Sequence, residues 1–277
     1  MGRRSIHRRP RRARRPGPSR ARDPGTCLSS PDLSSSAPPR LDVTHMALQP
    51  DDPLPPALAD TLRNTTREAV LNHNVKVKSD RWRAAAAERG LPAPTGRFQS
   101  EDTFFLTRAD VMAHADADIT PENAMELWYA TMAWGLGPSG SWFNLRLDGF
   151  AKAPETNIDL LVHAWATVRS GASAGDCYRR LLTEKGKPFI TQFGAAFATK
   201  YLYFAHGTTL PVRNLILDKV VATNLRDSAW PDSPITAWWA TTYQAYCDLL
   251  ADWAQQAADI RGAPVQPDEV EKAIFHM

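Results

Sequence analysis

FGAAFATKYLYFAHGTTLPVRNLILDKVV, residues Phe193 to Val221, holds one lysine, Lys200, inside a nearly unbroken apolar run. A buried ammonium group is costly, so this lysine must find a partner, extend to solvent or stay neutral. Eighteen residues later comes an aspartate, Asp218, directly after the apolar run Leu215–Leu217. The stretch therefore contains a candidate lysine–carboxylate pair.

The same stretch predicts two helices joined by a loop. Residues 195–205 have helical length and composition, and Gly207 supplies a C-cap. Pro211 predicts a loop over residues 208–214, and Asp218 suits the N-cap of a helix over residues 219–225. Gly194 predicts a tight turn with a positive φ angle before the first helix. A return segment of this length can place Asp218 beside Lys200, since a helix rises only about 1.5 Å per residue.

A period of 3.6 residues dominates the rest of the chain and predicts a mainly α-helical protein, with one short strand over residues 103–106. Thr120-Pro121-Glu122 is a strong helix start, and that helix should run to Trp134. The other expected helices cover residues 57–72, residues 80–89 with Ser79 as N-cap, residues 158–170 with Asn157 as N-cap, a segment from Ser173 to near Gly186, residues 233 to about 260, and a last segment from Pro267.

The net charge of the chain changes sign near Met46, from a basic N-terminal segment to a mildly acidic remainder. Residues 1–45 contain eleven arginines and three aspartates, a balance of +8, so residues 46–277 carry about −5 of the total of +3. We expect residues 1–45 to be a disordered tail rich in Arg, Pro and Ser, and residues 46–277 to form the folded domain. The tail arginines could touch nucleic acid, or the tail could be a translated extension with Met46 as the true start. The mildly acidic domain argues against nucleic-acid binding by bulk charge but not against a local basic groove.

Three cysteines lie far apart, and the histidines are scattered singly, so no zinc or iron–sulfur ligand set is expected. No apolar run approaches the roughly 18 residues of a membrane span. These features fit a reducing cytoplasm and a protein that needs no cofactor.

The segment AAFATKYLYF with its following Asp218 resembles the lysine and aspartate of the helix-hairpin-helix DNA glycosylase superfamily, most closely the 8-oxoguanine DNA glycosylases and bacterial relatives of that fold. The resemblance covers roughly residues 120–260. It implies a mainly α fold of two helical subdomains with the active site in the cleft between them, and a helix-hairpin-helix plus catalytic segment at about residues 180–226.

In catalysis, the resemblance implies an enzyme that excises a damaged or modified base from double-stranded DNA after flipping it out of the duplex. Lys200, held neutral by desolvation, would attack the sugar as a nucleophile, and Asp218 would stabilise the positive charge on the sugar. The resulting Schiff base could proceed to β-elimination, which would add AP-lyase activity. Phe204 stands where oxidised-guanine enzymes commonly have a cysteine, which weakens 8-oxoguanine as the specific substrate.

For DNA binding, the resemblance places the hairpin at Gln192, Phe193, Gly194, Ala195 and Ala196, where backbone N–H groups can bind phosphate. A monovalent cation is possible at such a hairpin, but Ala196 replaces the usual second glycine and argues against one. The loop GLGPSG, residues 135–140, follows a helix, so it does not open a dinucleotide-binding fold. The resemblance brings that loop near DNA, with Trp142 or Asn144 as a wedge; a plain helix–helix turn is the alternative.

For the base pocket, aromatic side chains suit a flipped base, and the resemblance points to five residues: Trp134, Phe204, Trp238, Trp239 and Tyr243. Aromatic residues at helical spacing also fill cores. Two other functions stay open for the whole chain. One is a catalytically inactive DNA-binding protein of the same fold, for instance in genome defence, and the other is an all-α interaction module.

Overall fold

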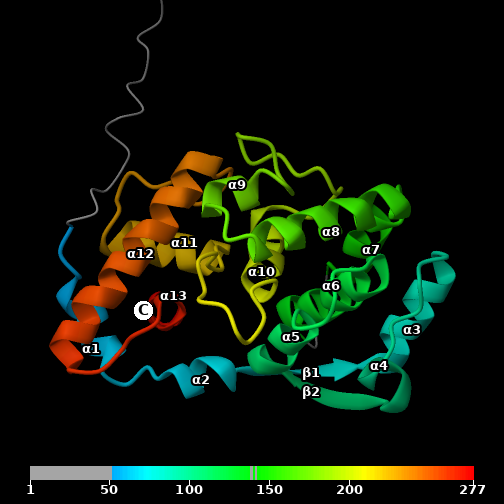
Figure 1. Ribbon diagram of the computed structural model, residues 1–277, viewed down its shortest axis with the longest axis horizontal. Helices are drawn as coiled ribbons and strands as arrows, with labels where there is room; N and C mark the ends of the chain where they lie inside the picture. The colour runs from blue at the N-terminus through cyan, green and yellow to red at the C-terminus, as the bar shows by residue number, and fades with distance from the viewer. Residues whose placement is uncertain (1–51, 138–139, 141) are drawn as a thin grey trace, which may run out of the picture. The chain divides into compact units, whose positions relative to one another are not determined.

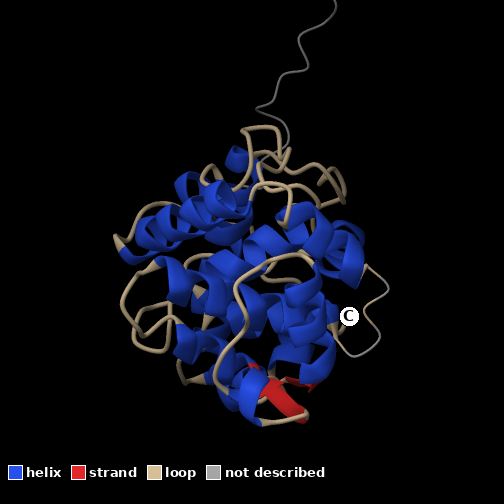
Figure 2. Ribbon diagram, turned by 90° about the vertical axis from the view of Figure 1, so that its right-hand side faces the viewer, coloured by secondary structure: helices blue, strands red, loops and turns tan. Residues whose placement is uncertain are grey.

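A computed structural model describes residues 52–137, 140 and 142–277 of the chain (Figure 1). The predicted tail, residues 1–45, lies outside the described residues. Within these ranges the chain is mainly helical, as expected, with one two-stranded sheet (Figure 2). In chain order the elements are α1 (Pro56–Leu62), α2 (Arg67–Leu71), β1 (Asn74–Lys78), α3 (Ser79–Glu88), α4 (Arg97–Ser100), β2 (Thr103–Thr107), α5 (Arg108–His114), α6 (Pro121–Leu136), α7 (Phe143–Phe150), α8 (Pro154–Arg169), α9 (Ala174–Tyr178), α10 (Ala195–Phe204), α11 (Lys219–Ser228), α12 (Ala240–Arg261) and α13 (Pro267–Phe275).

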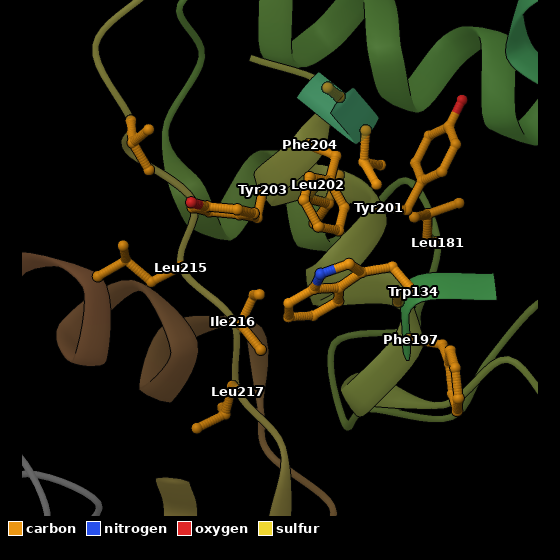
Figure 3. Close-up of a cluster of buried hydrophobic side chains, with 14 of the residues drawn as sticks. Trp134, Leu181, Phe197, Tyr201, Leu202, Tyr203, Phe204, Leu215, Ile216 and Leu217 are labelled. Carbon is orange, nitrogen blue, oxygen red and sulfur yellow. The ribbon is translucent and has the colours of Figure 1, made fainter. Parts of the chain in front are cut away.

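Helices α6 and α10 form the centre of the fold. The predicted start of α6 is confirmed: Thr120 is its N-cap, and the Thr120 hydroxyl accepts a hydrogen bond from the Asn123 amide. Helix α6 is buried along most of its length because α5, α8 and α10 pack against it. Helix α10 is likewise buried from Phe197 to Phe204, which fits a sequence that is apolar apart from Thr199 and Lys200. Figure 3 shows the α10 side chains gathered with Trp134 of α6 and the segment Leu215–Leu217.

The sheet pairs β1 and β2 in antiparallel register. Val77 lies opposite Phe104 on the buried face, and Lys76 lies opposite Phe105 on the exposed face. The predicted strand corresponds to β2, one residue longer. The partner strand β1 was not predicted, although Val75 and Val77 alternate with Lys76 and Lys78 as in a half-buried strand.

Several helix boundaries differ from the expected ones because local capping overrides periodicity. The expected helix over residues 57–72 is split, since Thr66 caps a separate helix, α2, by accepting from the Ala69 amide. Ser79 is the first residue of α3 rather than its cap. Helix α8 begins at Pro154, and Asn157 donates its side-chain amide to the Phe150 carbonyl instead of capping.

Two further helices are shorter than expected. Ser173 caps α9 as predicted, but α9 ends at Tyr178, and the chain then turns through the bridge between Leu182 and Pro188. Helix α12 begins at Ala240 rather than near Ser233, and it ends at Arg261, where Gly262 is the C-cap in the left-handed conformation. Helix α13 begins at Pro267, as expected.

The turn before α10 also corrects one expectation. Gly194 has a φ angle of −69°, and the positive φ angle belongs to Gln192, at 65°. A β-carbon added at Gly194 would meet no atom within 4 Å, so neither space nor backbone conformation requires glycine there. The hairpin is fixed instead by burial of Ile190 and Phe193 and by a hydrogen bond from the Phe193 amide to the Ile190 carbonyl.

Candidate active site

Lys200 lies on the sixth residue of α10 with its side chain almost enclosed. Its side chain is 8% exposed, and its Nζ donates to the Asp218 Oδ2 at 3.1 Å and to the Ala196 carbonyl at 3.3 Å. Gly135 makes room for the stem, since a β-carbon there would lie 3.1 Å from the Lys200 Cδ. A glycine at the end of α6 therefore lets that helix approach the lysine closely.

Asp218 uses its two carboxylate oxygens for different contacts. Oδ2 accepts from Lys200, while Oδ1 accepts from the backbone amides of Val220 at 3.1 Å and Val221 at 3.2 Å, which makes Asp218 the N-cap of α11. Burial alone would raise the pKa of Asp218, but the Lys200 ammonium and these two amides outweigh burial and hold the pKa below its usual value. The carboxylate is therefore ionised at neutral pH.

The segment before Asp218 is held by hydroxyl groups on both sides. The Thr199 hydroxyl, next to Lys200 in sequence, accepts from the Leu217 amide at 3.0 Å. From α12, the Tyr243 hydroxyl donates to the Leu215 carbonyl at 2.9 Å, and the Tyr246 hydroxyl donates to the Ile216 carbonyl at 2.8 Å. These bonds fix the return chain against α10, so the two residues that lie 18 positions apart meet.

The pair opens onto a pocket of about 140 Å³. Both the N-terminal and the C-terminal parts of the domain contribute to its wall, as does the Lys200–Asp218 pair. Trp134 and Ile216, both labelled in Figure 3, form part of its apolar wall. The lining residues are His73, Arg108, Trp134, Gly135, Lys200, Ile216, Asp218, Glu271 and Phe275.

A second ion pair forms part of the same wall. Arg108, the first residue of α5, donates to both carboxylate oxygens of Glu271 on α13, at 2.8 Å and 3.4 Å, and both side chains are buried. Burial alone would lower the pKa of Arg108, but Glu271 and Tyr203 raise it above its usual value. The guanidinium carbon also lies 5.0 Å from the centre of the Trp134 ring. The pocket wall therefore carries fixed charges of both signs beside an aromatic ring.

The structure places the five predicted base-pocket residues in different environments. Trp134 lines the pocket, and Phe204 packs edge-on against Trp134 at 5.3 Å without being part of the lining. Trp238 is buried against Trp230 and Tyr246, and Tyr243 is buried where it holds the Leu215 carbonyl. Trp239 is 41% exposed and lies near Lys185. Of the five, the structure brings Trp134 alone to the Lys200 pocket.

The hairpin residues lie directly before α10, on the side where the helix begins. Gln192 is exposed, Phe193 is buried, and residues 194–196 are partly exposed. The N-cap of α10 is Gly194, which has no side chain to cap the helix. The amides of Ala195 and Ala196 donate to no backbone carbonyl within the described part of the chain. These two amides can donate hydrogen bonds to an anion, which the positive end of the α10 dipole also favours.

Helix α7 connects the hairpin with the loop after α6. Arg146 of α7 donates to the Gln192 carbonyl, and Gly149 of α7 lies so close to the Thr191 carbonyl that any side chain there would clash with it. Trp142 is the N-cap of α7 and is 61% exposed, while Asn144 is exposed and accepts from Arg89 at 3.4 Å. Pro138, Ser139 and Ser141 of the predicted loop lie outside the described residues.

Basic side chains lie beside this loop. Lys76, Lys78 and Arg81 line a small pocket together with Gly137, the C-cap of α6, and Arg81 donates to the Gly140 carbonyl at 3.2 Å. The domain thus carries a local group of cations near the loop despite its acidic balance.

Sequence reasoning missed most of the pocket wall: His73, Arg108, Gly135, Glu271 and Phe275. Arg108 and Glu271 stand 163 positions apart, and each reads as an ordinary surface charge of an amphipathic helix. Gly135 begins the loop GLGPSG, which the resemblance places near DNA, and its contact with the pocket could not be read from that position. Within the residues that the structure describes, no cluster of three or more His, Cys, Asp or Glu side chains could hold a metal ion. The described helices include none with the length and apolar character needed to cross a membrane.

Comparison with known proteins supports one family. The model of the family described as "Putative 8-oxoguanine DNA glycosylase OGG-like protein" matches residues 68–275, which include both ion pairs, the hairpin and every lining residue of the pocket. No curated protein and no solved structure matches the chain significantly. Because the family match spans most of the chain, this protein belongs to the OGG-like family of putative DNA glycosylases.

Proposed function

We propose that the protein is a DNA glycosylase that excises a damaged or modified base, with Lys200 as the nucleophile and Asp218 as its partner. The observation that carries the proposal is the Lys200–Asp218 contact of 3.1 Å in the wall of a pocket with an aromatic side. A lysine beside a carboxylate in a partly enclosed pocket is a candidate nucleophile with a proton acceptor in reach.

In the proposed reaction, the flipped nucleotide presents its sugar to Lys200. Asp218 Oδ2 takes a proton from the Lys200 ammonium, and the free amine forms a bond to the anomeric carbon as the bond to the base breaks. The base leaves with the electron pair of that bond and takes up the proton that Asp218 received. Asp218 is then ionised again, and its carboxylate stabilises the positive charge on the sugar. Ring opening then gives a Schiff base, and β-elimination from it would break the 3′ phosphate bond, which is the AP-lyase step.

For DNA binding, we propose that the duplex lies across the face that carries the hairpin, the loop after α6 and the pocket opening. The uncapped α10 amides would bind one phosphate, Lys76, Lys78 and Arg81 would approach others, and Trp142 would fill the space left by the flipped base. Lining residues come both from α5, α6 and α10 and from α13, which supports two helical subdomains with the active site between them. We further propose that the protein acts as a monomer on cytoplasmic, nucleoid DNA and requires no cofactor.

Trapping with borohydride tests this proposal without knowledge of the base. The protein is incubated with duplex DNA that carries an abasic site, and borohydride reduces the Schiff base to a stable covalent adduct. We expect an adduct with the unaltered protein and none with Lys200→Gln, while DNA binding is retained. Lys219→Gln is the matched control, because Lys219 is exposed, stands next to Asp218 and makes no ion pair in the described structure.

Two outcomes would contradict the proposal. An adduct of equal yield in Lys200→Gln would place the nucleophile elsewhere. DNA binding with no adduct on abasic DNA and no excision from a panel of modified bases would favour a non-catalytic DNA-binding protein of this family. Absence of salt-dependent DNA binding would favour an interaction module.

A further inference from the structure

His73 enters the pocket wall from the turn between α2 and β1, and its backbone is fixed from two sides. Its carbonyl accepts from the Trp134 indole nitrogen at 3.1 Å and from the Arg108 amide at 3.0 Å. The His73 ring packs edge-on against the Trp134 ring, with centroids 5.1 Å apart. The imidazole is therefore held at one place beside the aromatic side of the pocket.

One nitrogen of this imidazole is occupied by a lysine. Lys272 of α13 places its Nζ 3.1 Å from the His73 Nδ1. Burial, followed by the Lys272 and Arg108 charges, lowers the pKa of His73 to about 4, so the ring is neutral near pH 7. Burial and Arg108 lower the pKa of Lys272 to about 8, so its charged form prevails below that pH. A charged lysine has three donors and no acceptor, so Nδ1 must accept and the ring proton must be on Nε2.

The other nitrogen, Nε2, has no hydrogen-bond partner within the described residues. This atom is not fully buried, so a ligand in the pocket can reach it. The remaining charged groups of the pocket wall are already paired, Lys200 with Asp218 and Arg108 with Glu271. The Arg108 Nε is also without a partner, but it is buried, whereas the His73 Nε2–H group is an unpaired donor that is not fully buried.

We propose that His73 is a specificity-determining residue: its Nε2–H donates to a carbonyl oxygen or an unprotonated ring nitrogen of the base that enters the pocket. Lys272 is a positioning residue, because it selects the tautomer that donates. This inference rests on the proposed function. A volume of about 140 Å³ is close to the ~150 Å³ of a cavity that holds one benzene ring. The enclosed part of the base is therefore about one ring, and its polar edge meets His73.

If His73 contacts the base and not the sugar, its substitution should affect base excision but not the reaction of Lys200 with the sugar. Loss of the donor leaves an acceptor of the base without a partner in a partly enclosed site, which should slow base excision about 10- to 100-fold. An abasic site has no base for His73 to contact. Borohydride trapping on abasic DNA should therefore stay within about twofold of the unaltered protein.

The test uses the full chain, duplexes that carry 8-oxoguanine, hypoxanthine, 5-hydroxycytosine or uracil, and abasic duplex. His73→Phe removes the donor, and His73→Gln supplies an amide donor in its place. Lys272→Met removes the contact that fixes the tautomer, and Lys272→Arg restores a group that can only donate. We expect His73→Phe and Lys272→Met to lose excision of the best substrate while they keep abasic trapping. We expect His73→Gln and Lys272→Arg to recover part of the excision.

The outcomes distinguish this inference from the proposed function. A parallel loss of excision and abasic trapping in His73→Gln and Lys272→Arg would overturn the inference, since His73 would then serve the fold or the chemistry. Unchanged excision in His73→Phe would overturn it as well. An unaltered protein that traps no abasic DNA and excises no base of the panel would overturn the proposed function itself, and the inference with it.

Discussion

Substitutions at Asp218 can separate its role as a helix cap from its role as the partner of Lys200. Each role uses a different oxygen, Oδ1 for the α11 amides and Oδ2 for the lysine. Asparagine keeps one side-chain oxygen for capping but removes the negative charge, and it ranks with aspartate as an N-cap. Alanine removes both contacts. The free energies of unfolding of the two variants should therefore differ only by the contribution of the helix cap.

The structure sets the expected magnitudes. The Lys200 side chain is 8% exposed and the Asp218 side chain 21%, so the pair is partly buried. Breaking a fully buried pair costs about 3–5 kcal/mol. Here Lys200 keeps its bond to the Ala196 carbonyl and Asp218 is nearer solvent, so we expect about 2 kcal/mol for Asp218→Asn. Loss of the cap adds about 1 kcal/mol for Asp218→Ala. For a domain of this size these values correspond to melting-temperature losses of about 4–8 °C and 6–12 °C.

Urea unfolding of the single variants and of the same changes in a Lys200→Met background measures both terms. In that background Asp218→Asn should cost less than about 0.5 kcal/mol, because no ammonium is left without a partner. Abasic trapping by Asp218→Asn should fall at least about tenfold, although its helix is still capped. The reasoning is refuted if asparagine and alanine destabilise equally, or if the asparagine cost is unchanged when Lys200 is absent.

Three further predictions concern packing and pH. Gly135→Ala should reduce abasic trapping more than stability, because the added methyl group meets the Phe197 ring and the Lys200 side chain, which can shift out of position. Trapping rates and thermal melts measured together check this, and unchanged trapping contradicts it. Gly149→Ala should lower the free energy of unfolding by about 1–3 kcal/mol and weaken DNA binding, because its methyl group meets the Thr191 carbonyl of the hairpin. Gly194→Ala should change the free energy of unfolding by less than about 0.5 kcal/mol. Equal effects of the two variants in urea titrations would disprove the hairpin packing. His206 is buried and its pKa is lowered to about 4, so below pH 6.5 the unfolded chain binds a proton that the folded chain does not. The free energy of unfolding should therefore fall as pH falls from about 6.5 to 4, by up to about 1.4 kcal/mol per pH unit. An equal slope in His206→Gln would contradict this.

The sequence could predict the site where its signals are local. Lys200 stands out because it interrupts an apolar helix, and Asp218 stands out because it precedes a helix that needs a cap. Both signals depend on neighbours within a few residues. The helical class and the helix starts at Thr120, Ser173 and Pro267 could be predicted for the same reason, since the residues that cap a helix are consecutive in the sequence.

The rest of the site could not be predicted, because it depends on contacts between distant segments. Arg108 and Glu271 are charged residues of amphipathic helices, and their burial becomes visible only when α5 and α13 meet. Aromatic residues on α12 have the spacing of a core and the chemistry of a base pocket, and spacing alone does not distinguish the two. Tyr243 shows the consequence: it is buried beside the return segment and positions Asp218 through the Leu215 carbonyl.

Gly194 and Gln192 show a similar limit in the hairpin. A glycine next to a helix start favours the expectation of a positive φ angle, but that angle is found two residues earlier, at Gln192. The tertiary packing of Ile190 and Phe193 fixes the turn, and the exposed Gln192 adopts the unusual conformation. The identity of a turn residue therefore did not reveal which position is strained.

The identity of the trapped amine tests the central claim most directly. The adduct formed with abasic DNA in the presence of borohydride is digested, and the cross-linked peptide is identified by mass spectrometry. The account predicts that the DNA fragment is attached to the Nζ of Lys200, in the peptide that spans α10. Attachment to the N-terminal amine or to an exposed lysine such as Lys219, at a yield unaffected by Lys200→Gln, would contradict it.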